Sequence, residues 1–528
     1  MSQSSRRCGV LVPLFSAPST RSWGCGEIGD VAPLASWLAG AGQRLLQLLP
    51  LNEMAPGDCS PYSAMSAMAF DPIYVSLLDV QEFADAGGVT SLSADDRSRL
   101  LDAQQSPHVQ YALVRSLKQR VLAAAFNRFL VHEGSTQTER GAALRAYVRD
   151  EAWWLDDYAL FRAIHDREGG RVWTEWPEEV RGRSPAGLAR ARTELAREVL
   201  FYQYVQWVAA AQWSNARDAA AAAGVALFGD LPFMVELHSA DVWAHQQCFD
   251  LDRSVGVPPD AFSATGQDWG MPAYNWAAFA AHDYRWLRDR ARRSAQLFDG
   301  YRIDHLVGFY RTYSRRRSDR GDAAFSPTRE AEQLRLGERV LHLFREAGAE
   351  VVAEDLGTVP DFVRASLALL GVPGFRVFRW ERLWNVPGQP FRDPSEYPIV
   401  SVATSGTHDT EPLATWWDAA QEEERRAILA IPSVRRITGD ADLVHSPFEP
   451  DVRDALIEVL CAAASRIVIL PVQDVFGWRD RINQPATVND VNWTYRLPWL
   501  SDRLGEQPIA RERQNTLRGW ALQYGRIS

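Results

Sequence analysis

The sequence contains almost no lysine. Of its 57 basic residues only Lys118 is a lysine, and it lies in a stretch, 109–131, that has the composition of a helix. Schiff-base chemistry and nucleotide-binding P-loops both need a lysine beside the reacting group, in the second case after a strand and a glycine-rich turn. Because Lys118 follows neither feature, both kinds of site are excluded.

Cysteine, long apolar runs and positive charge are also scarce. The five cysteines are odd in number and form no C-x-x-C pair, which predicts reduced thiols and a cytoplasmic protein. No apolar stretch approaches the ~18 residues that a membrane span requires, and the run after Arg6 and Arg7 is too short for an export signal. The formal charge of −10 argues against nucleic acid or an anionic membrane as a partner.

Short apolar runs bounded by turn residues are the main feature that is present. They predict eight buried strands, at 8–14, 45–51, 225–230, 300–304, 350–354, 375–380, 399–404 and 467–472. Helical patterns fill several gaps, for example 330–347, whose apolar residues recur with a 3.6-residue period. Eight strands alternating with helices predict an α/β fold, a closed (β/α)8 TIM barrel.

The spacing of the predicted strands is uneven. About 170 residues separate the second from the third and about 70 the third from the fourth, far more than the ~30 of an ordinary βα unit. We therefore expect large, mostly helical insertions after strands 2 and 3: a helical subdomain at 52–224 and a loop region at 231–296 over the active site. No internal repeat or linker-like tract divides the chain, which predicts one catalytic domain over 1–528.

Three carboxylates, Asp304, Glu354 and Asp409, each follow a predicted strand. The carboxyl ends of barrel strands are where active sites are built, and a buried acid is costly unless it is paired or used. Arg302 lies two residues before Asp304, so it points the same way and would keep that acid ionised, as a nucleophile requires. The apolar residues 351–353 would raise the pKa of Glu354 and let it donate a proton.

Each of these groups also has a structural interpretation when it is taken alone. Arg302 with Asp304 is then a structural ion pair, and His408 is a packed structural histidine. Three acids on separate strands of one barrel, however, match the needs of acid-assisted glycosidic bond cleavage. A metal site is disfavoured, because the sequence has no H-E-x-x-H and His238 with Asp241 is too sparse a set for zinc.

Longer motifs resemble those of glycoside hydrolase family 77, the 4-α-glucanotransferases or amylomaltases, which are relatives of the α-amylase superfamily. The resemblance spans nearly the whole chain. It rests on SWGCGEIGD (22–30), SPYSAMSAMAFDP (60–72), GDLP (229–232), SADVWA (239–244), GVPPDAFSATGQDWGMP (256–272), YRIDH (301–305), AEDLG (353–357), GTHD (406–409) and RINQP (481–485).

That resemblance implies a role for each candidate site residue. Asp304 is the nucleophile, Glu354 the general acid/base and Asp409 the stabiliser of the transition state. The residues implied to bind substrate are Arg302, His305, His408, Asp230, Tyr62 as a donor platform, Gln267 and Trp269 over the acceptor side, and Asn483. No cofactor and no metal is implied. The implied partners are α-1,4-glucans and maltooligosaccharides, with glucose as an acceptor.

The implied reaction is a retaining double displacement through a glycosyl-Asp304 ester. Two alternatives stay open at this point. In a retaining α-glucan hydrolase, water reaches the ester before a sugar does. In a non-catalytic glucan-binding barrel, Asp304→Asn changes nothing in product formation.

Overall fold

The structure is a computed structural model that describes residues 6–133, 138–259, 266–319, 321–439, 441–485, 487 and 489–527. Eight parallel strands form a closed barrel, which confirms the predicted TIM barrel. Around the barrel they follow the order β1 (Arg7–Leu11), β12 (Ile467–Pro471), β11 (Ser401–Thr404), β10 (Gly374–Val377), β9 (Glu350–Ala353), β6 (Gly300–Ile303), β3 (Ala226–Leu231) and β2 (Leu45–Gln47).

Every predicted apolar run overlaps one of these strands, although most runs are longer than the strand. The run 45–51, for example, gives a strand only over Leu45–Gln47. Leu48 and Leu49 are nevertheless buried, because the chain continues into a packed loop at the barrel mouth. Hydrophobicity reports burial, and here burial extends beyond the hydrogen-bonded ladder.

Helices cover the outside of the barrel. Those that precede or follow barrel strands are α1 (Val31–Gly40), α8 (Ala196–Ala222), α11 (Arg285–Leu297), α13 (Glu330–Glu346), α14 (Asp361–Leu370), α18 (Pro450–Ala462), α19 (Val472–Phe476) and α20 (Pro508–Gln523). The predicted helix at 330–347 is confirmed as α13, which buries Val340, Leu341 and Phe344. Between β10 and β11, residues 378–400 contain only the 3-10 turns η8 (Phe378–Trp380) and η9 (Pro394–Glu396).

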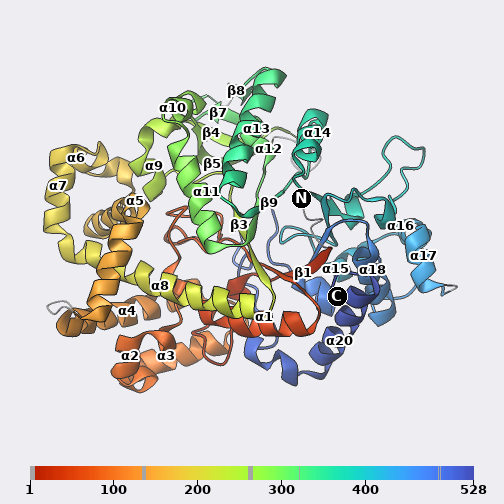
Figure 1. Ribbon diagram of the computed structural model, residues 1–528, viewed down its shortest axis with the longest axis horizontal. Helices are drawn as coiled ribbons and strands as arrows, with labels where there is room; N and C mark the ends of the chain where they lie inside the picture. Colours follow the sequence, from red (N-terminus) through yellow and green to blue (C-terminus); the bar gives the residue numbers. More distant parts are fainter. Residues whose placement is uncertain are drawn as a thin grey trace.

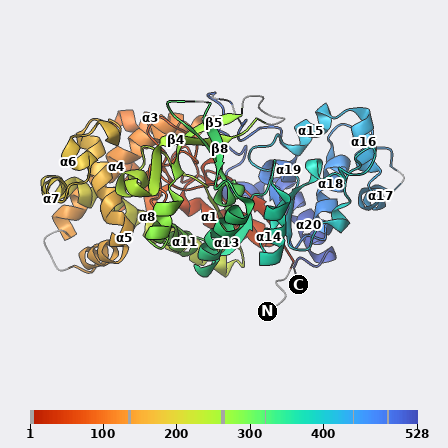
Figure 2. The ribbon, with the colours of Figure 1, turned by 90° about the horizontal axis from the view of Figure 1, so that it is seen from above.

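The insertion between β2 and β3 is helical, as predicted. Besides α8 it contains α2 (Gln81–Asp85), α3 (Ala94–Gln105), α4 (Tyr111–Glu133), α5 (Glu139–Arg167), α6 (Glu178–Arg181) and α7 (Pro185–Glu194). In two perpendicular views α5 to α7 lie at one end of the elongated molecule, and α15 (Leu413–Ala419), α16 (Glu422–Leu429) and α17 (Pro432–Thr438) lie at the other (Figures 1 and 2).

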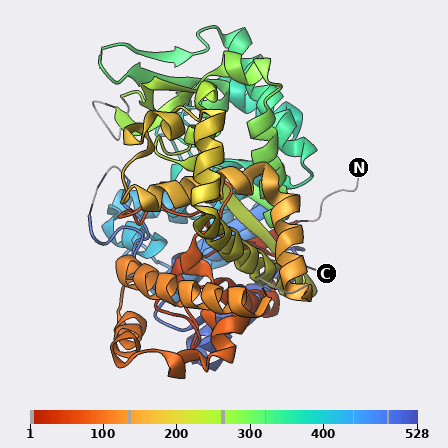
Figure 3. The ribbon, with the colours of Figure 1, turned by 90° about the vertical axis from the view of Figure 1, so that its left-hand side faces the viewer.

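A four-stranded antiparallel sheet accompanies the barrel and was not predicted. Its order is β5 (Gln267–Tyr274), β4 (Phe249–Val257), β7 (Thr312–Arg316) and β8 (Ala323–Ser326). The insertion after β3 supplies β4 and β5, together with α9 (Ala240–Ala244) and α10 (Trp276–Ala281), and the connection after β6 supplies α12 (Val307–Tyr310), β7 and β8. Figure 3 shows these green elements above the orange and yellow helices of the first insertion.

Helix length and composition also bear on membranes. Within the ranges that the structure describes, none of the helices is both long and apolar enough to cross a bilayer.

Candidate active site

Asp304 and Glu354 emerge side by side from the barrel. Strand β6 pairs with β9 so that Ile303 lies opposite Ala353. These two residues end their strands, and each acid is the residue that follows. The backbone N–H of His305 donates to Oε2 of Glu354 at 2.8 Å, and that of Leu356 donates to Oε1 at 3.0 Å. The strand register therefore brings the two predicted acids to the same end of the barrel and fixes the orientation of Glu354.

The chain turns sharply directly after Asp304. His305 has a φ of 42°, in the left-handed region, which is unusual for a residue with a side chain. Such backbone strain costs about 1–3 kcal/mol and tends to persist at functional sites. Here the strained conformation accompanies the hydrogen bond from His305 to Glu354. The His305 ring packs edge-on against Trp269, with 4.9 Å between ring centroids.

The acceptor-side pair named from sequence lies on β5. Trp269 Nε1 donates to Oε1 of Gln267 at 3.2 Å, and Trp269 contacts His305. Burial lowers the pKa of His305 to about 4, although the Asp304 charge opposes the shift, so the imidazole is neutral at pH 7. The antiparallel sheet thus contributes two predicted site residues directly beside the residue that follows Asp304.

Arg302 joins two acids. Its Nη2 lies 2.8 Å from Asp304, and its Nη1 lies 2.8 and 2.9 Å from the two oxygens of Asp230. The Asp230 side chain is 0% exposed, and it also accepts a hydrogen bond from the Tyr62 hydroxyl at 2.9 Å. Burial raises the pKa of Asp230 to about 6, although Arg302 opposes the shift. Asp230 therefore lies behind Arg302 in this structure, where its partners are protein groups.

Asp409 lies beyond the end of β11, after the turn 405–408. Its Oδ2 is 3.3 Å from His408 Nε2, its Oδ1 accepts from Asn483 Nδ2 at 2.6 Å, and Arg481 donates to its backbone carbonyl at 2.6 Å. Burial alone would raise the pKa of Asp409, but His408 and Asn483 outweigh it and lower that pKa to about 2. Asp409 is consequently ionised, and its side chain is 41% exposed.

Tyr62 connects these groups from the other side. Its ring stacks on the His408 ring at a centroid distance of 5.2 Å and an interplanar angle of 20°. Because its hydroxyl donates to Asp230, Tyr62 is in contact with both the Arg302 cluster and the Asp409 cluster. The structure thus brings together all eleven residues named from sequence, in contacts that link β3, β5, β6, β9 and the loops after β2, β11 and β12.

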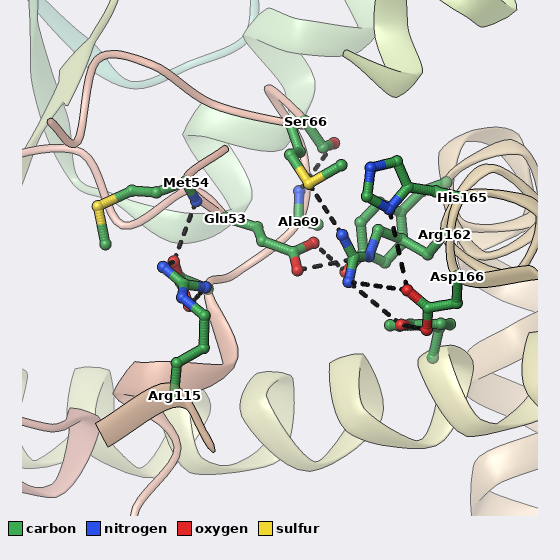
Figure 4. Close-up of polar contacts among 12 residues, drawn as sticks. Glu53, Met54, Ser66, Ala69, Arg115, Arg162, His165 and Asp166 are labelled. Atoms are coloured by element: carbon green, nitrogen blue, oxygen red, sulfur yellow. Dashed lines mark hydrogen bonds and ion pairs between the residues drawn. The ribbon is translucent and has the colours of Figure 1, made fainter. Parts of the chain in front are cut away.

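Buried ion pairs hold the loop that presents Tyr62. The loop is closed by the bridges Asn52↔Phe70 and Met54↔Ala64. Behind it, Glu53 accepts from the Tyr158 hydroxyl at 2.6 Å and lies 3.5 Å from Nε of Arg162 on α5 (Figure 4). Figure 4 also shows Arg115, which contacts both carboxylate oxygens of Asp71 at 3.0 and 3.1 Å.

Sequence reasoning missed several residues that shape this site. Arg481 stands in the RINQP motif two residues before Asn483, so its spacing offered a signal. Glu53, Arg162 and Trp493 offered none, because their contacts join segments far apart in the chain. In the structure Glu53 and Arg162 form an ion pair, and Trp493 packs against Tyr62 and His408.

The three acids have different electrostatic surroundings. Burial raises the pKa of Glu354 to about 7, with the neighbouring Asp304 adding to the shift and Arg302 opposing it. Asp304 is fixed by the Arg302 guanidinium and Asp409 is ionised. Two neighbouring carboxyl groups, one fixed beside a cation and one able to hold a proton near neutral pH, form the arrangement used for retaining glycosidic bond cleavage.

Comparisons with known proteins agree with this geometry. Residues 12–501 match the model of glycoside hydrolase family 77, described as 4-alpha-glucanotransferase. The chain is 34% identical over 509 residues to the 4-alpha-glucanotransferase of Thermus thermophilus (93% of this chain, 95% of that one). It is 30% identical over 500 residues to that of Chlamydia pneumoniae (93% and 91%).

Solved structures include a similar protein of the same size. An amylomaltase from Streptococcus agalactiae, in complex with acarbose, superposes with a TM-score of 0.83 at 26% identity, covering 99% of this chain and 100% of that one. An amylomaltase from Corynebacterium glutamicum, at 23% identity, shares the fold with a TM-score of 0.80 over 99% of this chain and 75% of that one.

Proposed function

Because the chain belongs to the 4-alpha-glucanotransferase family of glycoside hydrolase family 77, a family that acts on alpha-glucans, we propose a retaining double displacement on α-1,4-glucans. A glucan segment moves from a donor to the 4-hydroxyl of an acceptor glucan or of glucose. The observation that supports it most is the contact between the segments carrying Asp304 and Glu354, together with the pKa of Glu354 near 7.

In the first half-reaction a carboxylate oxygen of Asp304 forms a bond to the anomeric carbon as the glycosidic C–O bond breaks. Glu354 gives its proton to the departing oxygen, and a β-glycosyl ester of Asp304 remains. In the second half-reaction Glu354 takes the proton of an acceptor 4-hydroxyl, whose oxygen displaces Asp304. A pKa near 7 suits a group that must both give and take a proton at neutral pH.

The remaining site residues bind and orient the sugar. Asp409 faces the positive charge that develops on the ring, and Arg302, His305, His408 and Asn483 contact hydroxyls. Tyr62 forms the donor-side platform, while Gln267 and Trp269 border the acceptor side. Asp230 orients Arg302 and Tyr62, since its buried carboxylate accepts hydrogen bonds from both side chains. The amylomaltase solved with acarbose, a relative over its full length, supports a glucan-like ligand in this site.

The elements around the barrel mouth favour transfer over hydrolysis. Insertions at 52–224 and 231–296 flank the site within one catalytic domain, 1–528. We expect these insertions to exclude water once a glucan is bound, so that a sugar displaces Asp304 before water does. A cytoplasmic location is part of the proposal, because all five cysteines are described and all are free thiols.

Incubation with maltotriose tests the proposal. A transferase produces free glucose together with a ladder of longer maltooligosaccharides, while the concentration of reducing ends stays nearly constant. Steady growth of reducing ends without longer products would instead identify a hydrolase. The Asp304→Asn variant is the control: unchanged product formation in this variant would favour the non-catalytic glucan-binding alternative.

A further inference from the structure

Trp493 contacts two predicted sugar-binding side chains at once. Its ring centroid lies 5.7 Å from that of Tyr62, at an angle of 48°, and 5.7 Å from that of His408, at 39°. Since Tyr62 also stacks on His408, the three rings form one cluster. Trp493 is only 9% exposed, so most of its ring is packed inside the protein, beside His408, which is 2% exposed, and the half-buried Tyr62.

The backbone at Trp493 is strained and firmly held. Its φ is 65°, in the left-handed region that large aromatic residues rarely adopt. Its N–H donates to the Ile482 carbonyl at 2.8 Å, and its own carbonyl accepts from the Tyr111 hydroxyl at 2.8 Å. The following residue, Thr494, accepts from the N–H of Val109 at 2.8 Å. Strain that the surroundings maintain in this way points from an observed outlier to a function.

The His408 ring has few other restraints. Its Nε2 lies 3.3 Å from Asp409, whereas its Nδ1 is buried with no hydrogen-bond partner among the described residues. A single polar contact leaves the ring free to rotate about that contact. Packing against Tyr62 and Trp493 therefore decides where the imidazole plane lies.

We propose that Trp493 is a positioning residue, which holds His408 and Tyr62 so that His408 stays paired with Asp409. The proposal rests on the proposed function, because its readouts are those of glucan transfer. Trp493 touches no reacting atom. It acts through His408, whose contact keeps Asp409 ionised, and through Tyr62, whose hydroxyl reaches Asp230.

Two variants and a matched control separate this role from simple packing. Trp493→Leu removes the ring, and Trp493→Phe keeps an aromatic face. Trp520 on α20 is buried to the same degree, at 8% exposed, and its recorded cation–π contact is with Arg513, so Trp520→Leu measures the cost of losing a buried tryptophan elsewhere. The measurements are kcat and KM on maltotriose between pH 4 and pH 9, with thermal unfolding of each variant.

The expected result is specific to the site. Small displacements of catalytic groups cost up to about a hundredfold in rate, so we expect kcat of Trp493→Leu to fall by about tenfold or more. The wild-type pKa of Asp409, about 2, lies below the measured range, so the wild type should show no acid limb from this group. In Trp493→Leu an acid limb should enter the range, since Asp409 loses the partner that lowers its pKa. Trp493→Phe should recover most of the rate, and Trp520→Leu should lower only the melting temperature.

Two different failures remain distinguishable. If Trp493→Leu keeps the wild-type kcat and the wild-type pH profile while melting at a lower temperature, the residue is only structural and the inference is wrong. If the wild-type protein makes no product longer than maltotriose when it is given maltotriose, the proposed function fails instead. Calorimetric titration with acarbose then still tests the ring cluster, because loss of Trp493 should weaken binding and loss of Trp520 should not.

Discussion

Arg302 Nη2 lies 2.8 Å from the Asp304 carboxylate, and the two residues stand two apart at the end of one strand. Alternation along the strand places both side chains on the same face. Strand register adds Asp230, which pairs directly opposite Arg302 across β3 and β6. One guanidinium therefore fixes two acids with separate nitrogens, a geometry that the single ammonium of a lysine cannot reproduce.

Replacing Arg302 by lysine should separate charge from geometry. Arg302→Lys keeps the positive charge but cannot reach both acids, so kcat should fall by about a hundredfold because Asp304 loses its fixed position. Asp230 should lose hydrogen bonds while buried, at a cost of about 1–3 kcal/mol in unfolding free energy. Maltotriose kinetics and urea denaturation measure the two effects.

A matched control lies at the other end of the barrel. Arg7 pairs with Glu350, so Arg7→Lys changes an arginine–carboxylate pair away from the acids. This variant should keep its activity. Equal kinetic losses in the two variants would show that Arg302 has no special role.

The pH dependence of donor cleavage should report Glu354. Because burial raises the pKa of Glu354 to about 7, this acid is protonated below that pH and ready to donate. We expect kcat/KM for maltotriose to fall about tenfold per pH unit above pH 7. In Glu354→Gln the alkaline limb should disappear along with most of the activity, and a maltosyl fluoride donor, whose leaving group needs no proton, should restore the first step. An unchanged alkaline limb in the glutamine variant would assign that limb to another group.

The same raised pKa predicts how stability varies with pH. The ordinary pKa of Glu354 is 4.5, so between pH 4.5 and about 7 the folded state keeps a proton that the unfolded state releases. The contribution of Glu354 to the unfolding free energy therefore falls as the pH rises through that window, and it levels off above it. Glu354→Gln removes the effect, so its stability relative to the wild type should increase from pH 4.5 to pH 7. Denaturant midpoints measured at pH 4.5, 6 and 8 test this, and a constant difference would contradict it.

Local patterns were sufficient to predict the barrel. Parallel strands buried on both faces are continuous apolar runs, so each strand was visible in its own sequence, and the acids were visible as the polar residues after two of them. The polar strand β4, in contrast, has the sequence FDLDRSVGV and depends on pairing with β5 and β7. Such pairing is a long-range property, which the sequence of one segment does not reveal.

The same limit applies within the site. The sequence named Asp230 beside the sugar, but its burial follows from its register opposite Arg302, and only the assembled barrel shows that register. Trp493 lies close to Asn483 in sequence, yet its ring contacts come from Tyr62 and His408, far away in the chain. The sequence was sufficient to name side chains that the fold brings into contact, whereas it did not point to Trp493, which packs against two of them.

Lys118, the one lysine of the chain, lies in a position that suits an ammonium group. On α4 it is 1% exposed, and its Nζ donates to the carbonyls of Ile73 and Val75 and pairs with Glu27 at 2.6 Å. Three acceptors match the three N–H groups of an ammonium. A guanidinium is larger, planar and carries five donors, so it would leave some unsatisfied in the same space.

Lys118→Arg should therefore destabilise the protein although it keeps the charge. We expect a loss of about 1–3 kcal/mol from overpacking a buried site. Lys118→Met should cost about 3–5 kcal/mol, because it leaves the Glu27 carboxylate buried without its partner. Arg120→Lys on the same helix is the control: it pairs with Asp96 at the surface, and exchanging it should change the unfolding free energy by less than about 1 kcal/mol. Urea denaturation of the three variants at pH 7.5 gives the comparison, and equal stability of Lys118→Arg and Arg120→Lys would show that the pocket accepts either cation.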